Sequence, residues 1–410
     1  MIKGKNIVLD ANNSQKWRFW PVQLSVFIFA FSSPLLMLAI PIYYFQKGIE
    51  IKFISVLSIA LTITYSVSPI LLNKFSDKLG RKKSVIISMV GVACAQLIFY
   101  ITLNPIVFLI ERLFEGFILG FFFPNLTASI SDAPNIDHQK YLARFNLSWS
   151  VAVVFGLLFG AIVLQFTDNL KFIFYINPIF PVMNSIIVIL FFRESNSSNL
   201  NTRTKSAVFD TKNLENQYSI KMSNHYIPVI IPLLFILYTS FAAGNGSLLY
   251  PIRSVILGFH ESSTYVANIF ASASQSIATY LVTLLPLMKL RLISIITLLV
   301  YPFIFFFFIV NEVYFLFIIL FLFSGLFYGI LYGAASKLFI TLNVLKNTSK
   351  FSGISESSTA IAYFISQIFL GFIADINIGL AYFSLSVSLI IIFFINLIFM
   401  RNFKEIERRL

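Results

Sequence analysis

Long apolar stretches alternate with short polar segments along the whole chain. A helix needs about 20 largely apolar residues to cross the hydrocarbon core of a bilayer. Stretches of that length recur twelve times, in two sets of six. They are expected at 22–45, 51–73, 84–102, 105–126, 145–166 and 172–192, and then at 227–250, 264–286, 292–310, 312–336, 352–374 and 378–400. We therefore predict an all-α polytopic membrane protein with 12 transmembrane helices in two six-helix bundles.

A polar segment separates the two sets of helices. It covers residues 193–226, is rich in Asn, Ser and Thr, and has the composition of a partly disordered cytoplasmic linker. We expect it to join an N-terminal bundle at 1–192 to a C-terminal bundle at 227–410. This layout suggests an internal repeat, which is common in secondary transporters.

Glycine spacing supports the repeat. Gly116 and Gly120 lie four residues apart in the fourth span, and Gly325, Gly329 and Gly333 repeat that spacing in the tenth span, its counterpart. Glycines at this spacing clear one face of a helix, so that a neighbour can approach closely. Because the pattern is common in membrane helices, coincidence stays open as an alternative.

The composition fits a lipid environment. Hydrophobic residues make up 58% of the chain and charged residues 11%, which is too little polar surface for a soluble protein of this length. The net charge of +13 is spread over the gaps between apolar stretches, which argues against nucleic acid as a partner. His138, His225 and His260 are too scattered for a metal site, and the single Cys94 excludes a disulfide framework. We expect the lipid bilayer as a partner and no cofactor.

The distribution of Lys and Arg predicts an orientation. With a cytoplasmic N-terminus, most of the 30 basic residues fall on the cytoplasmic side, and the external loops carry Lys47, Lys52, Lys171 and Arg253. Both termini are therefore expected in the cytoplasm, with the chain crossing the plasma membrane many times. The first residues are polar and charged, so we expect the first span itself to drive insertion.

The fourth span holds the densest group of ionisable residues. Glu111 and Glu115 share a helix face, and Arg112 neighbours Glu115 at i, i+3. Such residues are costly inside a membrane and should face one another or a water-filled cavity. One guanidinium cannot neutralise two carboxylates, so one Glu should take up a proton. We expect proton coupling at Glu115 and Arg112, whereas Glu111 fits a solvated position near the outer headgroups equally well. Glu356 is either a second titrating site or an ordinary cytoplasmic residue.

The loop after the second span carries a motif. It reads Asn73-Lys-Phe-Ser-Asp77-Lys-Leu-Gly80-Arg81-Lys82-Lys83. This resembles the signature loop of the major facilitator superfamily, G-x-x-x-D-[RK]-x-G-R-[RK], with Asn73 in place of the leading Gly. The corresponding loop of the second half, Met-Lys-Leu-Arg-Leu at 288–292, does not repeat it.

Two glycine motifs resemble the same family. Arg112-x-x-x-Gly116 is similar to the family's fourth-helix motif, with Glu115 where a Gln is often found. Gly156-x-x-x-Gly160 is similar to its fifth-helix motif, without the usual Pro. By motif the resemblance covers the N-terminal half, and by topology the whole chain.

The resemblance implies that the signature loop acts as a conformational latch. Its members would be Asp77, Gly80 and Arg81, together with Asp132 and Arg144 of the loop between the fourth and fifth spans. Alternating charges on neighbouring loops form ion pairs that exist in one arrangement of the halves and break in another. The alternative is that these are ordinary loop charges that fix the topology.

Several polar and aromatic residues inside the spans are candidates for a substrate cavity. Gly244 and Gly246 interrupt the seventh span, where an unwound segment would expose backbone groups to a solute. The tyrosine pair of the tenth span fits packing as well as a cavity wall. The candidates are Asn146, Trp149, Asn245, Arg253, Asn268, Gln275, Tyr328 and Tyr332.

These features favour transport over other functions. No G-x-x-x-x-G-K-[ST] phosphate loop is present, which disfavours a primary pump, and no catalytic motif indicates an enzyme. We expect a monomeric secondary active transporter that binds a small organic solute and protons and works by alternating access. The Phe-rich helices favour a hydrophobic or weakly polar organic solute. Efflux of hydrophobic compounds is one such function, and import against export stays open. An uncoupled facilitator, an uptake permease for sugars or organic ions, and a transporter-like membrane sensor are the alternatives.

Overall fold

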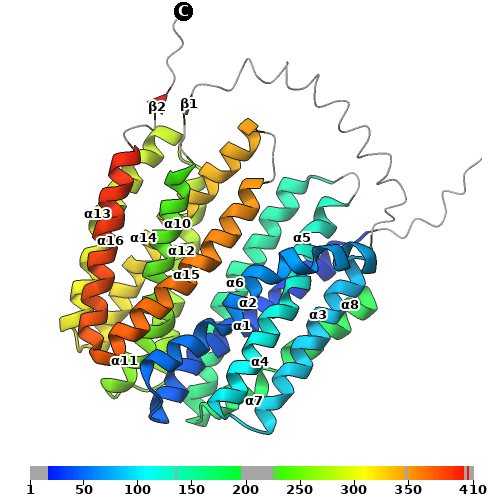
Figure 1. The fold of residues 1–410 in the computed structure, drawn as a ribbon, viewed down its shortest axis with the longest axis horizontal. Helices are drawn as coiled ribbons and strands as arrows, with labels where there is room; N and C mark the ends of the chain where they lie inside the picture. Colours follow the sequence, from blue (N-terminus) through cyan, green and yellow to red (C-terminus); the bar gives the residue numbers. More distant parts are fainter. Residues whose placement is uncertain are drawn as a thin grey trace, which may run out of the picture.

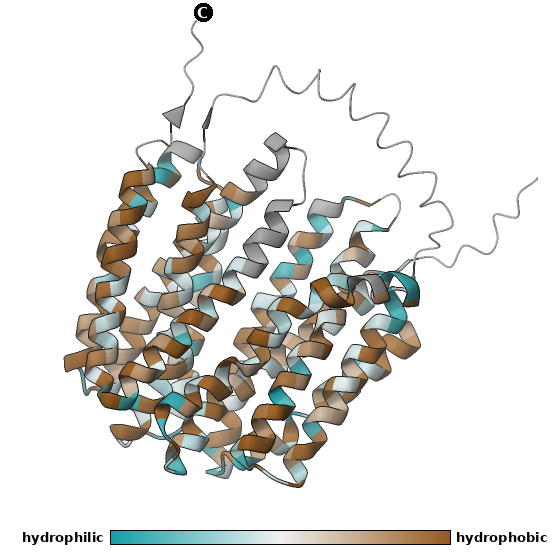
Figure 2. Ribbon diagram, viewed as in Figure 1, coloured by the Kyte–Doolittle hydropathy of each residue, from teal (hydrophilic) through white to brown (hydrophobic). Residues whose placement is uncertain are grey.

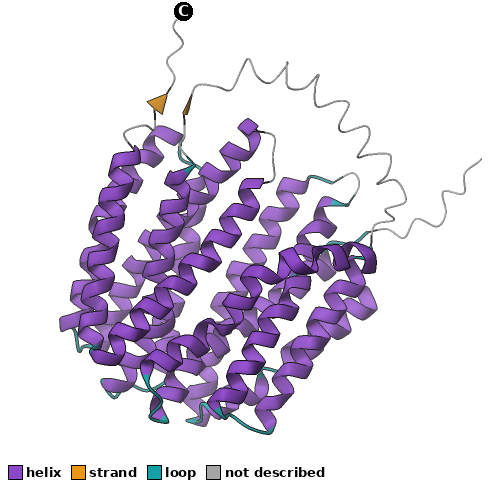
Figure 3. Ribbon diagram, in the orientation of Figure 1, coloured by secondary structure: helices purple, strands orange, loops and turns teal. Residues whose placement is uncertain are grey.

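The computed structural model describes residues 17–133, 136–194, 225–226, 229–346, 350–400 and 404–405, and it is helical almost throughout (Figure 3). Most of the predicted linker at 193–226 lies outside these residues. The first half holds α1 (Trp20–Gln46), α2 (Ile51–Leu79), α3 (Arg81–Gln96), α4 (Pro105–Ile118), α5 (Phe123–Ser131), α6 (His138–Thr167), α7 (Lys171–Ile176) and α8 (Ile179–Phe191). The 3₁₀ segments η1 (Leu97–Tyr100) and η2 (Leu119–Phe121) extend α3 and α4.

The second half begins with a seventh span in three parts. These are α10 (Ile230–Gly244), the π-helical turn η3 (Asn245–Leu249) and α11 (Tyr250–Ile256). The other helices are α12 (Ser262–Thr283), α13 (Leu287–Val310), α14 (Tyr314–Lys346), α15 (Lys350–Ile376) and α16 (Ile378–Met400). A short antiparallel pair of strands, β1 (His225–Tyr226) and β2 (Lys404–Glu405), lies outside the helices.

The helices carry apolar surfaces long enough for a membrane, with polar residues gathered toward the helix ends (Figure 2). Within the described residues, ten helical runs are long and apolar enough to cross a bilayer. The two other predicted spans are also helical. One is divided into α4, η2 and α5, and the other is α12, whose Ser, Thr, Asn and Gln residues make it less apolar. The chain is therefore an all-α polytopic membrane protein, as predicted.

The glycine repeat corresponds to equivalent helix packing in the two halves. Gly116 of α4 lies against the backbone carbonyl of Leu61 in α2, and Gly325 of α14 lies in the same way against Ala271 in α12. A threonine hydroxyl donates a hydrogen bond across each of these helix pairs. Thr64 donates to the carbonyl of Leu113 over 2.8 Å, and Thr279 donates to the carbonyl of Gly329 over 3.1 Å. The pairs α2–α4 and α12–α14 are thus built alike, which coincidence in spacing does not explain.

The two halves lie side by side (Figure 1) and contact each other through α2 with α15 and α6 with α12. We name the two ends of the molecule after α1, which runs from the Trp20 end to the Gln46 end. Polar contacts between described residues of the two halves concentrate toward the Gln46 end. They include Gln46 with Glu261 at 2.9 Å, Lys52 with Asp375 at 3.6 Å, and Asp168 with His260 at 2.6 Å. Nearer the middle of α1, Tyr265 donates to the Leu35 carbonyl over 2.7 Å.

A continuous apolar core also spans both halves, with Leu38 and Leu57 from the first and Leu248 and Leu370 from the second. A second apolar cluster belongs to the first half alone and includes Val85. The apolar core and the polar pairs together hold the halves against each other toward the Gln46 end.

Candidate functional site

The ionisable residues of α4 form a buried cluster. Asn104 caps the start of the helix, and Glu111, Arg112 and Glu115 are at most 8% exposed. The Arg112 guanidinium forms an ion pair with Glu115. The Gln96 amide donates to the second oxygen of Glu115 over 3.1 Å. Both oxygens of Glu115 are therefore occupied by donors from α3 and α4.

A break in the sixth span supplies one further member of this cluster. Pro178 follows Asn177 between α7 and α8, and Asn177 is buried at this break. Its amide donates to Gln96 over 3.0 Å, so that Asn177, Gln96 and Glu115 form a chain of hydrogen bonds. Gln96 and Asn177 were not predicted from the sequence, although an amide side chain inside an otherwise apolar span is a usable signal of a functional site.

Glu111 is buried next to the ion pair, with 6% of its surface exposed. Of the two interpretations that the sequence left open for Glu111, its burial does not fit a solvated position near the outer headgroups. Among the described residues, neither of its carboxylate oxygens has a hydrogen-bond partner. The cluster holds two carboxyl groups and one guanidinium, so it is electrically neutral only when it also binds one proton.

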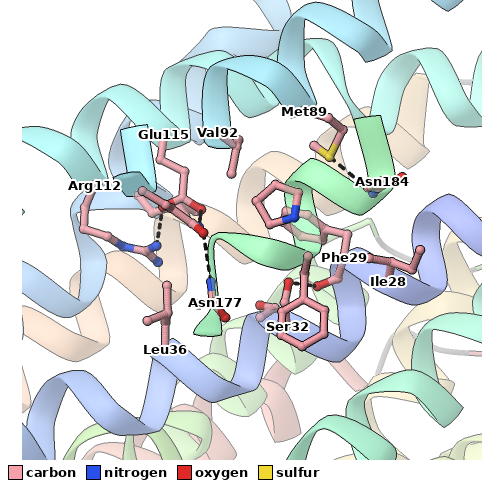
Figure 4. A pocket seen from close by; sticks show the side chains of 15 residues that line it. Ile28, Phe29, Ser32, Leu36, Met89, Val92, Arg112, Glu115, Asn177 and Asn184 are labelled. Atoms are coloured by element: carbon pink, nitrogen blue, oxygen red, sulfur yellow. Dashed lines mark hydrogen bonds and ion pairs between the residues drawn. The ribbon is translucent and has the colours of Figure 1, made fainter. Parts of the chain in front are cut away.

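A small cavity adjoins the cluster (Figure 4). Its volume is about 30 Å³, which is enough for about two water molecules. Arg112 and Glu115 point toward one another at one side of it, and Asn177 and Ser32 lie on other sides (Figure 4). The cavity thus places polar side chains of α1 beside the carboxyl group of Glu115 in α4.

A larger cavity of about 250 Å³ lies between the two halves. Ser33 of α1 lines both this cavity and the small one, so the two share a wall. Five of the predicted cavity residues line it: Trp149, Asn245, Asn268, Gln275 and Tyr328. Polar and aromatic lining residues that were not predicted from the sequence include Ser247, Tyr301, Phe321, Ser324 and Tyr363.

The seventh span meets the large cavity at the π-helical turn η3. The sequence predicted an unwound segment here. The backbone instead stays helical, and one turn of it widens into a π-helix. Gly246 leaves room for Asn268, whose amide donates to the Gly246 carbonyl over 3.4 Å and to the Thr264 carbonyl over 2.9 Å. Such turns are frequent at functional sites because they displace side chains from the regular helical positions.

The signature loop forms an ion-pair network between helices of the first half. Arg81 lies between Asp77 at 3.1 Å and Asp132 at 3.3 Å, and its guanidinium also donates to Asn125 over 3.3 Å. Gly80 has a φ of +86°, a left-handed conformation that favours glycine.

Glu194 is a further member of this region that the sequence did not reveal. Its carboxylate accepts from the Lys82 backbone N–H over 2.5 Å, at the start of α3. A negative charge at a helix N-terminus is stabilising. A Cβ at Gly80 would lie 3.0 Å from the same carboxylate, so a small residue is needed there. The loop is thereby fixed to the end of the sixth span.

The sequence also matches a family model. That family model is described as Major Facilitator Superfamily and matches residues 22–345 of this chain. The chain belongs to the Major Facilitator Superfamily. It is a multi-pass membrane transporter of that superfamily.

A known transporter is similar in sequence to part of this chain. A curated relative, the "Staphyloferrin B transporter" of Staphylococcus aureus (strain NCTC 8325 / PS 47), is 27% identical over 157 residues. That alignment covers 37% of this chain and 38% of the relative. The superfamily resemblance inferred from the signature loop is thus confirmed.

Solved structures share the fold. A D-xylose-proton symporter has a TM-score of 0.66 at 14% identity, with 95% of this chain and 98% of that one covered. A bacterial homologue of the human lysosomal transporter Spinster, in an inward-facing and occupied conformation, has a TM-score of 0.70 at 12% identity, with 94% and 96% covered. At these identities the likeness concerns the Major Facilitator Superfamily fold alone.

Some predicted site residues lie elsewhere in this Major Facilitator Superfamily structure. Arg253 is buried away from the large cavity, where it donates to the carbonyls of Ile309 (2.9 Å) and Asn311 (3.2 Å) at the end of α13. It satisfies carbonyl groups that the helix itself leaves without partners. The prediction that Arg253 lines the cavity is therefore wrong.

Two other cavity candidates and one latch candidate also lie apart from the sites predicted for them. Tyr332 is partly exposed and stacks on Tyr328, with ring centroids 5.9 Å apart, and Asn146 is exposed. Neither lines the large cavity. Arg144 is exposed and lies over the ring of Tyr141, apart from the ion pairs of Arg81. The side chain of Glu356 lies outside the described residues.

Proposed function

We propose that the protein is a secondary active transporter that couples movement of a small organic solute to movement of protons. The observation that carries this proposal is the shared wall between the two cavities. Ser33 lines the large cavity between the halves and also the small cavity that contains Arg112 and Glu115. A proton bound in the cluster and a solute bound between the halves would therefore lie within reach of the same segment of α1.

The cluster has the composition that proton coupling requires. Glu115 is held by Arg112 and Gln96, whereas the buried carboxyl group of Glu111 has no hydrogen-bond partner among the described residues. Gain or loss of one proton changes the net charge of the cluster, and a charge in this environment is costly unless it is compensated. We infer that protonation changes how α4 packs against α1 and α3, and that Glu111 and Glu115 share the coupling proton.

Alternating access requires contacts that hold the halves together at one end. The pairs Gln46–Glu261, Lys52–Asp375 and Asp168–His260 supply such contacts at the Gln46 end. We propose that the Gln46 end faces outward and that both termini lie in the cytoplasm of a cell whose plasma membrane holds the protein as a monomer. The structure would then represent a state closed toward the outside.

The signature loop supports a second part of the mechanism. Arg81 connects Asp77 of α2 with Asp132 at the end of α5, and Glu194 connects α8 with α3. We propose that this network stiffens the Trp20 end of the first half, so that the half moves as a unit. The latch would act inside one half, since Asp77, Arg81 and Asp132 all belong to it.

Flux through proteoliposomes with and without an imposed proton gradient tests the proposal. The panel should include D-xylose and staphyloferrin B, after the symporter and the transporter that this chain resembles. We expect accumulation of at least one solute only when the gradient is present. Equal flux under both conditions would identify an uncoupled facilitator instead, and the sign of the effective gradient would distinguish uptake from efflux.

A further inference from the structure

The large cavity is lined by apolar side chains and by uncharged polar side chains. Of the described residues that line it, none is acidic or basic. Its polar groups are the amides of Asn245, Asn268 and Gln275 together with hydroxyl groups, while the ionisable cluster of α4 lies beyond the wall that Ser33 provides. A charged solute would lose its hydration here without gaining an opposite charge, which is strongly unfavourable.

One cavity-lining residue has a polar atom without a partner. Asn245 lies in the π-helical turn η3 and is 1% exposed, and its buried side-chain oxygen has no hydrogen-bond partner among the described residues. A buried acceptor without a donor is destabilising. A small turn of this side chain toward the cavity would let a solute donate a hydroxyl or amide hydrogen to the oxygen and remove this cost.

Aromatic side chains complete the cavity wall. Trp149 of α6 packs edge-on against Phe123, with ring centroids 5.3 Å apart, and Tyr328 of α14 stacks on Tyr332. Tyr301 and Tyr363 add further rings from α13 and α15. Rings held by their neighbours present flat apolar surfaces, which suit the apolar face of a ring-bearing molecule.

We propose that the cavity selects an uncharged, ring-bearing solute that donates a hydrogen bond to Asn245. This inference rests on the proposed function, because it takes the large cavity as the transport site. The amides of Asn268 and Gln275 provide further hydrogen bonds, and the aromatic rings contact the ring of the solute. The expectation of a hydrophobic or weakly polar solute is thereby narrowed to a solute with one polar and one apolar face.

Matched pairs of compounds that differ in charge test the class of solute. The pairs are a hexose with its uronic acid, a hexose with its 2-amino derivative, and a nucleoside with its 5′-monophosphate. Binding is followed by fluorescence of Trp149 in a Trp17→Phe, Trp20→Phe protein, in which it is the remaining tryptophan of the three. We expect the neutral member of at least one pair to bind at least tenfold more tightly than its charged partner. Equal or tighter binding of the charged members would overturn the proposal.

Substitution of Asn245 tests the position of the hydrogen bond. We expect Asn245→Ala to weaken binding of the neutral solute about tenfold, the effect of one lost hydrogen bond. Asn396→Ala is the matched control, because Asn396 is also a buried Asn whose side-chain oxygen lacks a partner, but it lies in α16 outside the large cavity. Unchanged binding in Asn245→Ala, or an equal loss in Asn396→Ala, would contradict the proposal.

The two proposals fail in different ways. A neutral solute that binds through Asn245 but moves equally fast with and without a proton gradient would exclude coupling and support the solute class. A charged solute that accumulates with the gradient would support coupling and overturn the solute class.

Discussion

At the scale of single residues, the buried Arg112–Glu115 pair shows how much of the site the sequence contains. The spacing in α4 placed both side chains together, and the structure adds their burial. Gln96 and Asn177 could not be assigned to the cluster from the sequence, because α3 and the break between α7 and α8 reach it only through folding. Arg253 was misassigned for the same reason, since its carbonyl partners belong to the distant end of α13.

Removal of one partner of the Arg112–Glu115 pair should lower the free energy of unfolding far more than removal of both partners. Arg112→Leu leaves the buried Glu115 without its cation, and we expect a loss of roughly 3–5 kcal/mol in the free energy of unfolding. The double variant Arg112→Leu, Glu115→Leu should recover most of this loss, because the one carboxyl group left in the cluster, that of Glu111, is neutral once it binds a proton. Thermal unfolding in detergent measures both. Additive losses in the double variant would show that the two side chains do not interact.

At the scale of elements, the helix pairs α2–α4 and α12–α14 are the clearest part of the fold that the sequence predicted. The spacing of glycines identified α4 and α14 as counterparts, and the structure shows their glycines against backbone carbonyls of α2 and α12. The π-helical turn η3 was not predictable in detail. Gly244 and Gly246 signalled an irregularity, but whether the helix unwinds or widens depends on its packing against Asn268.

The close contact at Gly325 predicts a graded response to alanine. A Cβ at Gly325 would collide with the Ala271 carbonyl, whereas one at Gly333 would lie 3.1 Å from the nearest atom, the Thr279 carbonyl oxygen. We expect Gly325→Ala to destabilise the protein by roughly 1–3 kcal/mol. Gly333→Ala should be nearly neutral, because a gain in helix propensity of about 1 kcal/mol offsets mild crowding. Melting temperatures of the two variants provide the comparison, and equal shifts would refute it.

At the scale of the whole molecule, the arrangement of the two halves determines which side of the membrane reaches the large cavity. The ten long apolar helical runs among the described residues, and their order, followed from hydropathy alone. The contacts between the halves did not, because Asp168 with His260 and Lys52 with Asp375 are far apart in the sequence and lie on loops and helix ends. Such pairs depend on the state of the transporter, which a sequence does not specify.

Loss of the polar pairs between the halves should open the cavity toward the Gln46 end. In a Cys94→Ser background, a Ser272→Cys probe in the large cavity reports access by a membrane-impermeant maleimide. We expect Asp168→Asn with Asp375→Asn to raise labelling from the Gln46 side several-fold, because each exposed pair contributes about 0–1 kcal/mol. Glu312→Gln, an exposed substitution in the loop after α13, is the control. Unchanged labelling in the double variant would mean that these pairs do not hold the outer side closed.

Coupling at Glu115 is the central claim, and one comparison tests it most directly. Wild-type protein and Glu115→Gln are reconstituted, and solute accumulation under a proton gradient is measured beside solute exchange at equal pH on both sides. We predict that Glu115→Gln retains exchange but loses accumulation, while the exposed control Glu312→Gln retains both. Gradient-driven accumulation by Glu115→Gln at the wild-type level would contradict the account, and the cluster in α4 would then be structural.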